Sequence, residues 1–420
     1  MPNTWFETLL SAAPQQNHSL SISGGNDVLK TRLSVRYQDQ DGVIKNFGNK
    51  IGEMRLNSDY QVSKRLKVSG DVNYRYSATE SPTTNASSPL NNFLHGTLWA
   101  VPKYADGTYG LSTQGNNPLM FIEIGGQSKQ KTDYLAGYVK AELEIADGLV
   151  FSTQIAGRGL FTQQKNYTNA YTNWDKNTNI TKTITNNSLT EVRNNLREYT
   201  LNNLLTYEKG FGNHNVKALV GYSQIGNTQT FLQAYRERFY NNDIGSIGQG
   251  ANDGTKSNSG NDAVYGLRSF FGRVNYDYDG KYLLEANARY DGSSKFTGAK
   301  QYSVFPSFSG GWRISKENFW QGIEHAVNDL KVRGSWGITG NQSVDLYSYY
   351  AALTASGYNF GGAAVQGYRQ NTLANTNLGW ESTTQLDIGL DAAFLNKRLN
   401  LTVDYYRKVT NDILLNLAIP

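Results

Sequence analysis

Residues 65–76 alternate between two kinds of side chain without interruption, and this constrains the fold more than any other feature of the sequence. A period of two residues predicts a β-strand with one apolar and one polar face. A soluble sheet with one wet face can show the same pattern, but here it recurs in one predicted strand after another. This recurrence favours an outer-membrane barrel with a polar lumen. The apolar face would carry Leu66, Val68, Gly70, Val72, Tyr74 and Tyr76, and the polar face Arg65, Lys67, Ser69, Asp71, Asn73 and Arg75.

Length and hydropathy narrow the class further. The 420 residues show no linker and no break in composition, so residues 1–420 are predicted to form one β-barrel domain. Mean hydropathy is −0.55, and no apolar run approaches the roughly 18 residues of a membrane-spanning helix. These features exclude a helical membrane protein. A barrel is compatible with them because half of each of its strands is polar.

Composition agrees with a barrel and excludes several other functions. The 42 glycines, 28 tyrosines and 7 tryptophans are typical of bent strands with aromatic girdles. Cysteine is absent, which excludes a thiol nucleophile and a cysteine metal site. The net charge is +5, but lysine and arginine are spread along the strands, so no nucleic-acid partner is predicted.

Period-two patterns and turn residues predict about 14 strands. Four longer connections separate some of them, at 78–129, 163–190, 236–261 and 340–378. A short helix is expected within 91–101, and a single helical turn is expected to start at Ser315. The predicted strands are 18–24, 29–39, 51–61, 65–77, 132–145, 149–162, 191–207, 215–230, 263–278, 281–290, 302–314, 330–338, 380–394 and 398–409.

Short and long connections alternate along most of the chain. Bacterial outer-membrane barrels have short periplasmic turns and long outer loops, whereas a soluble sandwich has no reason to separate them. A strand of about 12 residues, tilted by about 40°, projects roughly 31 Å and exceeds the ~25 Å apolar band. The expected fold class is therefore an all-β, antiparallel transmembrane β-barrel.

No catalytic or metal site is predicted, and no cofactor. The histidines, His18, His95, His214 and His325, show no metal-ligand spacing. Paired carboxylates such as Asp387 and Asp391 could suggest acid–base work on sugars, but their spacing places each pair on one strand face, which favours lumen-lining residues. The Asn252-Asp253-Gly254 segment is interpreted as a turn rather than a calcium site.

Aromatic side chains in the long loops are the predicted substrate-binding residues. Their rings can stack on sugars or on other flat ligand faces, and loop packing is the alternative interpretation. Strand aromatics such as Tyr74, Tyr278 and Tyr406 are instead assigned to membrane-interface belts. The predicted binding set is Trp99, Tyr104, Tyr109, Tyr167, Tyr171, Trp174, Tyr347, Tyr349 and Tyr350.

Several long motifs in the last 140 residues carry a family resemblance. The chain resembles the SusC/RagA family of TonB-linked outer-membrane transporters of Bacteroidetes. Segments 16–26 and 39–43 also resemble the start of that family's barrel and its first hairpin. The motifs are RYDGSSKF at 289–296, FPSFSGGWRISKENF at 305–319, LKVRGSWGITGNQ at 330–342, NLGWE at 377–381, DIGLD at 387–391 and NLTVDYYRK at 400–408.

The resemblance implies a 22-stranded barrel closed by an N-terminal plug, of which this chain would supply about 14 strands. It also implies a SusD-like lipoprotein lid, energy supplied through TonB, ExbB and ExbD, and an oligosaccharide or peptide substrate. The plug and the final strands are expected to lie outside the chain, and Met1 is expected to be an internal start. The fragment alone is expected not to insert stably, because unpaired edges are costly in lipid.

Three functions are compatible with this interpretation of the sequence. The first is active import of nutrients, with oligosaccharides favoured, across the outer membrane of a Gram-negative bacterium. The second is a passive porin, which shares the barrel but needs no plug. The third is a secreted β-rich carbohydrate-binding protein or adhesin, which would be recovered without detergent.

Overall fold

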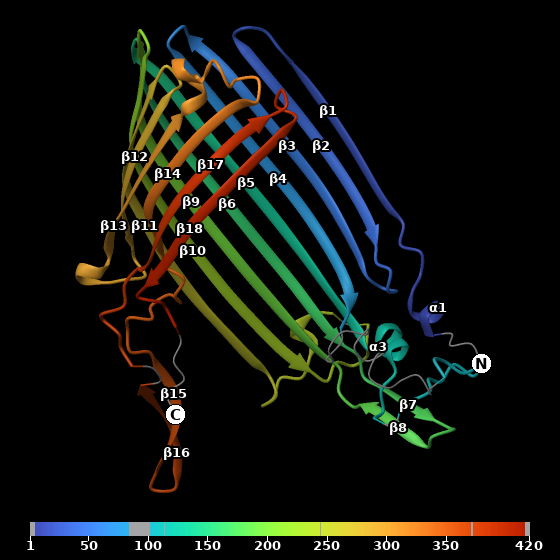
Figure 1. The fold of residues 1–420 in the computed structure, drawn as a ribbon. Coiled ribbons are helices and arrows are strands. Elements are labelled where there is room, and N and C mark those ends of the chain that lie inside the picture. The colour runs from blue at the N-terminus through green and yellow to red at the C-terminus, as the bar shows by residue number, and fades with distance from the viewer. Residues whose placement is uncertain (1–4, 84–100, 113, 244, 371–372, 416–420) are drawn as a thin grey trace.

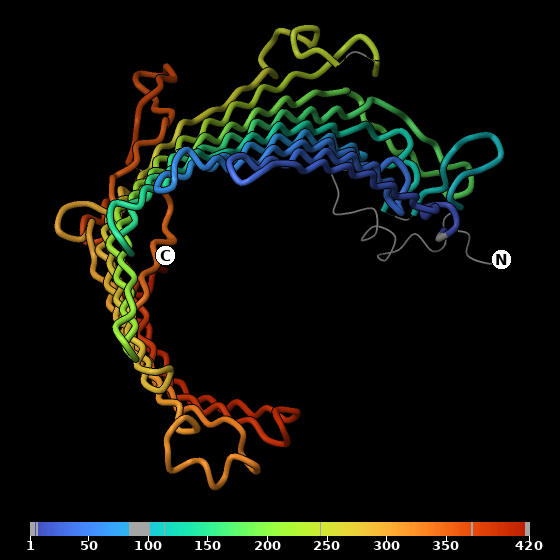
Figure 2. Tube along the Cα trace, turned by 90° about the horizontal axis from the view of Figure 1, so that it is seen from above, coloured from blue at the N-terminus to red at the C-terminus, as the bar shows by residue number. Residues whose placement is uncertain are grey.

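A single antiparallel sheet of fourteen strands dominates the computed structural model, which describes residues 5–83, 101–112, 114–243, 245–370 and 373–415. The sheet curves into an open arc (Figures 1 and 2), and its edge strands are the first and the last. Its strands, in spatial and chain order, are β1 (Gln15–Gly25), β2 (Leu29–Asp41), β3 (Gly48–Ser63), β4 (Leu66–Pro82), β5 (Gly126–Ala146), β6 (Leu149–Thr168), β9 (Ser188–Phe211), β10 (His214–Glu237), β11 (Ser257–Tyr278), β12 (Tyr282–Ser293), β13 (Tyr302–Arg313), β14 (Val327–Asn341), β17 (Glu381–Phe394) and β18 (Leu399–Asn411).

Two hairpins lie outside this sheet, β7–β8 (Tyr171–Asp175 and Ile180–Ile184) and β15–β16 (Leu353–Phe360 and Ala363–Gln370). The described helices are short: α1 (Trp5–Leu9), α3 (Pro118–Ile124) and the 3-10 helices η1 (Ile247–Gln249), η2 (Gly298–Lys300), η3 (Ile314–Lys316) and η4 (Asn318–Trp320). In the part of the chain that the structure describes, no helix combines the length and the hydropathy needed to cross a membrane.

The fourteen predicted strands are confirmed one for one, although most are longer than predicted. β9 and β10 reach 24 residues each and continue into segments expected to be loops. The expected helix at 91–101 falls almost entirely outside the described residues. The helical turn expected at Ser315 is confirmed as η3 and η4, but the Ser315 side chain does not cap it; its hydroxyl donates to Asp329 instead.

The tight turns lie at one end of the sheet, and the four connections predicted to be long lie at the other (Figure 1). The connection between β13 and β14, residues 314–326 with η3 and η4, is the exception, because it lies at the tight-turn end. Asp279 and Gly280 illustrate the short end, with φ of 53° and 61°, the left-handed values that a two-residue hairpin turn requires. The β7–β8 and β15–β16 hairpins both belong to the long end. The predicted separation of loop lengths is therefore confirmed except between β13 and β14.

The two faces of the sheet differ as the alternation predicts, and the polar face is the concave one. Side chains converge on the inside of an arc and diverge on the outside. Asp71 and Asn227 on the polar face are only 7% and 2% exposed, whereas Ile155 on the apolar face is 66% exposed. Val72, Ile388 and Val403 also lie exposed on the apolar face, with no second sheet of the described chain packed over them. A sandwich with a dry interior is therefore excluded.

Aromatic residues form two bands on the convex face. Near the tight turns, Tyr278 stacks on Tyr282, with ring centroids 6.1 Å apart. Eight residues further along β12, Tyr290 stacks on Tyr302 at 5.0 Å. Eight strand residues at ~3.4 Å and about 40° tilt project roughly 21 Å, close to the height of an apolar bilayer band. Tyr406 does not belong to these bands, because it pairs with Asp387 on the concave face.

A small dry core orders the long-connection end. We call this region the loop platform: α1, the described residues of 101–125 and the β7–β8 hairpin. Its core is the only cluster of buried hydrophobic residues found in the described chain. Ile44, Phe121, Ile124, Tyr171 and Ile180 pack around its buried members, which are Trp5, Leu9, Tyr109, Leu111, Leu119, Met120 and Ile122.

Candidate functional site

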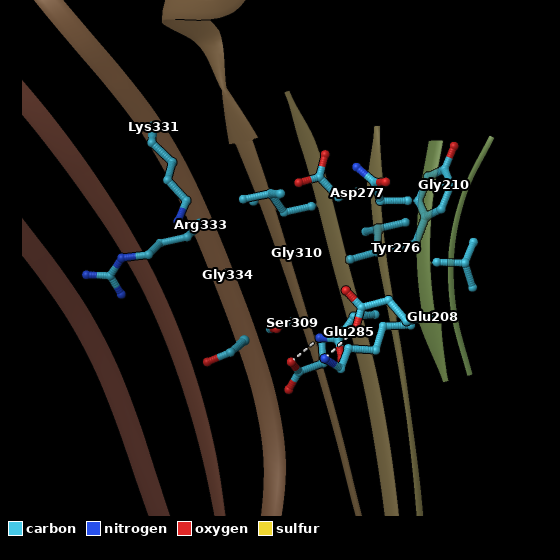
Figure 3. A pocket seen from close by; sticks show the side chains of 18 of the residues that line it. Glu208, Gly210, Tyr276, Asp277, Glu285, Ser309, Gly310, Lys331, Arg333 and Gly334 are labelled. Atoms are coloured by element: carbon cyan, nitrogen blue, oxygen red, sulfur yellow. Dashed lines mark hydrogen bonds and ion pairs between the residues drawn. The ribbon is translucent and has the colours of Figure 1, made fainter. Parts of the chain in front are cut away.

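The concave wall carries a continuous row of polar side chains across seven strands, from β9 to β17. Strand register fixes the row, because directly paired residues share a face. The row borders a hollow of about 750 Å³ (Figure 3). Its members are Glu208, Lys217, Asn275, Glu285, Ser309, Ser335 and Asp387.

Neighbouring side chains along this row form ion pairs and hydrogen bonds with one another. Lys217 Nζ lies 2.6 Å from Glu208 Oε2. Glu285 accepts hydrogen bonds from the amide groups of Asn275 and Asn287, the latter at 2.7 Å. The charges of Lys217 and Glu208 therefore offset each other, whereas Glu285 is bound by neutral amides, and the wall presents donors and acceptors to a ligand.

Arg333 organises the end of the row. Its guanidinium lies 3.3 Å from Asp387, 3.1 Å from Asp391 and 2.5 Å from Asp404. It crosses β17 over Gly389, where an added Cβ would lie 2.5 Å from Arg333 Cζ. Only glycine leaves this space, so Gly389 allows one arginine on β14 to hold carboxylates on both β17 and β18.

A second hollow, of about 970 Å³, adjoins the first toward the long connections. Here the half-buried ring of Phe271 joins the polar wall, and the ring of Phe305 lies buried behind it against Trp380. The Arg289 guanidinium stands 4.8 Å from the Phe271 ring centroid and donates two hydrogen bonds to Asp291, at 3.1 and 3.0 Å. Rings flanked by charged and amide groups suit ligands with flat apolar faces and many hydroxyl or amide groups.

Apart from Tyr167 in β6, the described members of the predicted binding set fall into two groups that the structure does not bring together. Tyr104, Tyr109, Tyr171 and Trp174 belong to the loop platform, while 347–350 precede β15 at the other side of the arc (Figure 1). Trp99 lies outside the described residues. The contacts of the others differ between the two groups, and so does their access to a ligand.

Within the platform the tyrosines make internal contacts. Tyr109 is 4% exposed, and its hydroxyl donates to Glu123 at 2.7 Å. Tyr104 donates to Asp175 at 3.0 Å, and Tyr171 packs on the core. Trp174 is exposed, with Nε1 3.2 Å from Asn179 Oδ1, so it is the platform aromatic best placed to meet a ligand.

The other predicted aromatics lie elsewhere at the long-connection end. Tyr167 belongs to β6 rather than to a loop, and its hydroxyl donates to the Asn241 carbonyl at 2.9 Å. The Tyr347 hydroxyl contacts the backbone of Val264. Tyr349 and Tyr350 have ring centroids 4.3 Å apart, and Tyr350 is 61% exposed. A binding role for this set stays a prediction.

Two carboxylates tie the platform loops together and titrate abnormally. Burial of Asp175 opposes its ionisation, but hydrogen bonds from the amides of Leu111 and Asn177 outweigh burial and lower its pKa. Hydrogen bonds from Lys176 and Thr108 hold the pKa of Asp106 well below its usual range. Both groups therefore remain charged at neutral pH.

Comparison with known proteins identifies the family to which the chain belongs. The family model described as TonB dependent receptor-like, beta-barrel matches residues 59–420. The chain belongs to that family. As a TonB-dependent receptor barrel it lies in an outer membrane, and its tight turns mark the periplasmic side, so the loop platform faces outward.

Sequence relatives agree. TonB-dependent receptor P3 of Formosa agariphila is 32% identical over 99% of the chain and 42% of its own length. TonB-dependent receptor SusC of Bacteroides thetaiotaomicron is 26% identical over 99% of the chain and 43% of its own length. The chain spans less than half of the length of these relatives.

Solved structures show the same fold. The RagAB peptide importer in its open-open state matches with a TM-score of 0.84 at 22% identity, over 99% of the chain and 46% of that chain. The ferripyoverdine receptor of Pseudomonas aeruginosa matches with a TM-score of 0.57 at 14% identity, over 94% of the chain and 47% of that receptor. The resemblance to SusC/RagA transporters inferred from the motifs is thus confirmed, as is the partial barrel.

The aromatic part of the wall was missed by sequence reasoning. Phe271 and Phe305 lie in strands, so they do not stand out from membrane-facing aromatics. The alternation of strand side chains could have revealed it. Phe270 and Phe271 are adjacent, so they point to opposite faces of the strand and only one of them can face lipid. The Asp387 and Asp391 pair was correctly assigned to one face, and the structure adds Arg333 as its partner.

Proposed function

We propose that the receptor barrel forms the wall of an outer-membrane importer that takes up oligosaccharides. A SusD-like lipoprotein would cover the long-connection end, and TonB with ExbB and ExbD would supply energy. The proposal assigns the chain no covalent chemistry. The concave wall is the observation that carries it: a polar row next to a hollow with the half-buried ring of Phe271 offers both hydroxyl-binding groups and a stacking surface.

Uptake in the native bacterium tests the proposal. The gene is deleted and restored, and uptake of labelled oligosaccharides and labelled peptides is measured with and without a protonophore. Oligosaccharide uptake should disappear on deletion and after collapse of the proton gradient. Uptake that persists without the gradient would indicate a porin, and loss of peptide uptake alone would indicate a peptide importer.

A matched pair of variants locates the site. Phe271→Ala removes a ring from the concave hollow, whereas Phe270→Ala removes a ring from the convex face of the same strand. Loss of one stacking contact should raise KM roughly 3- to 10-fold for F271A and leave it unchanged for F270A. Equal KM values for both variants would move the binding site away from this wall.

A further inference from the structure

A third hollow lies on the convex face, where a barrel meets lipid. It measures about 600 Å³ and forms on β9 to β13. Two adjacent rows of paired residues shape it. One row is Tyr199, Gly226 and Gly266, and the other is Gln224, Arg268 and Gly292, with Tyr302 paired to Gly292.

Glycines make the floor, and two tyrosines lie across it. A Cβ on Gly226 would stand 2.2 Å from Tyr199 Cε1, and a Cβ on Gly292 would stand 2.2 Å from Tyr302 Cε1. Each ring therefore lies directly over its glycine. Gly266 between them has no ring above it, since the nearest atom to its Cβ position is the Ile225 carbonyl oxygen at 3.4 Å.

The walls of this hollow are held in place. Gln224 donates to the Tyr199 hydroxyl at 3.1 Å and accepts from the Tyr222 hydroxyl at 2.6 Å. Tyr302 stacks on Tyr290 at 5.0 Å. Tyr199 is therefore held by Gln224 at the edge of the hollow and Tyr302 by Tyr290 outside it, which leaves the space between the two rings open.

Arg268 is the charged residue of the hollow, and it is unpaired. It is exposed, and no carboxylate, ring or hydrogen-bond acceptor among the described residues contacts its guanidinium. By contrast, Arg158, Arg289 and Arg333 on the concave face each pair with a carboxylate. Arg197 precedes Tyr199 by two residues and lies on the same face, with Cζ 5.8 Å from the Phe161 ring centroid. It adds a second positive charge near the hollow.

The height of Arg268 corresponds to the lipid headgroups. Arg268 precedes Phe270 by two residues, on the outward side of the outer aromatic band, and lies ten residues along β11 from Tyr278 in the periplasmic band. Ten residues project roughly 26 Å at ~3.4 Å each and about 40° tilt, which reaches the edge of the ~25 Å apolar region. An unpaired arginine is tolerated there because anionic headgroups surround it.

We propose that this hollow binds the phosphorylated headgroup of an outer-leaflet glycolipid. The planar guanidinium of Arg268 binds a phosphate through two parallel hydrogen bonds. Tyr199 and Tyr302 contact the sugar rings from either side, and Gly266 lets the headgroup approach the backbone. The site is separate from the import path, since it lies on the opposite face of the sheet.

Native mass spectrometry of the protein purified from outer membranes tests this site. The probes are lipid A carrying its phosphates and the same lipid after phosphatase treatment. The wild type should bind the phosphorylated lipid about tenfold more tightly. Arg268→Gln should lose this preference, Arg268→Lys should keep part of it, and Arg273→Gln, on the concave face of β11, should keep all of it.

A second variant tests the shape of the hollow. Gly266→Val adds a side chain to the open floor without meeting the backbone closer than ordinary contact, so it should weaken binding of both lipids several-fold. Heat-modifiable migration on a gel confirms that each variant is folded. The site is overturned if R268Q keeps the full preference for phosphate, or if G266V binds both lipids like the wild type.

Discussion

The barrel wall and the loop platform are ordered by opposite means. The wall has no dry core: its convex side chains are exposed to lipid, and fourteen strands are held by their backbone ladder. The platform has almost no ladder, and buried apolar side chains with a few buried amides hold it together. A ladder can be recognised from local alternation, whereas a core depends on contacts between distant loops.

The amides of the platform replace strand pairing. Asn173 accepts from the Tyr109 amide at 2.9 Å and donates to the Tyr109 carbonyl at 2.8 Å, as a neighbouring strand would. Asn117 accepts from the Met120 amide and donates to the carbonyls of Pro102 and Gly110. Removal of one such side chain should therefore disrupt the platform and leave the wall intact.

Asn117→Ala should have the largest effect. It leaves two buried backbone groups and the half-buried Pro102 carbonyl without this partner, so local opening of 101–112 should become easier by about 3 kcal/mol. Hydrogen exchange of that segment measures the change, and the amides of β9 and β10 should not respond. Asn116→Ala is the control, because its side chain makes no hydrogen bond within the described chain. Equal protection in both variants would contradict the comparison.

Acid should loosen the platform before the wall. The pKa of Asp175 is lower in the folded platform than its unfolded value of about 3.9, so its contribution is complete above that pH and is lost as pH falls through the folded pKa. Pepsin cleavage within 101–125, measured relative to cleavage in β9, should rise between pH 5 and pH 2. Asp175→Asn should be cleaved faster at pH 5 and show a flatter pH profile. A parallel rise in β9 would refute a local effect.

Gly389→Ala should destabilise the wall and leave the platform unchanged. The added methyl occupies the path of the Arg333 side chain, so one or more of its three ion pairs must break. The heat-modifiable transition should shift to lower temperature with platform exchange unchanged. Gly334→Ala is the control, since its Cβ would stand 3.8 Å from the Asp387 carbonyl oxygen.

Removal of the β15–β16 hairpin should have the smallest effect. Its Tyr358 and Phe360 rings contact each other at 4.9 Å, and both side chains are exposed. Replacement of 353–370 by a short glycine linker should change neither platform exchange nor wall melting by more than about 0.5 kcal/mol. A larger change would show that the hairpin supports the wall.

This contrast explains what could be predicted. Strand positions, turn ends and the faces of Asp387 and Asp391 follow from a period of two and from turn residues, which are local. The platform could not be predicted, because the burial of Tyr109 depends on Asn173, 64 residues away. The concave ring of Phe271 was missed for a different reason: its neighbour Phe270 is also aromatic, so the alternation is ambiguous there.

The polar row of the concave wall also bears on assembly. Shifting β17 by a single residue against its neighbours would turn Asp387 and Asp391 toward hydrocarbon and bring Leu386 and Ile388 into water. Each acidic group at mid-depth would then oppose insertion. A shifted strand register is therefore unfavourable in the bilayer during barrel assembly. The polar row that faces the passage thus helps to select the native register.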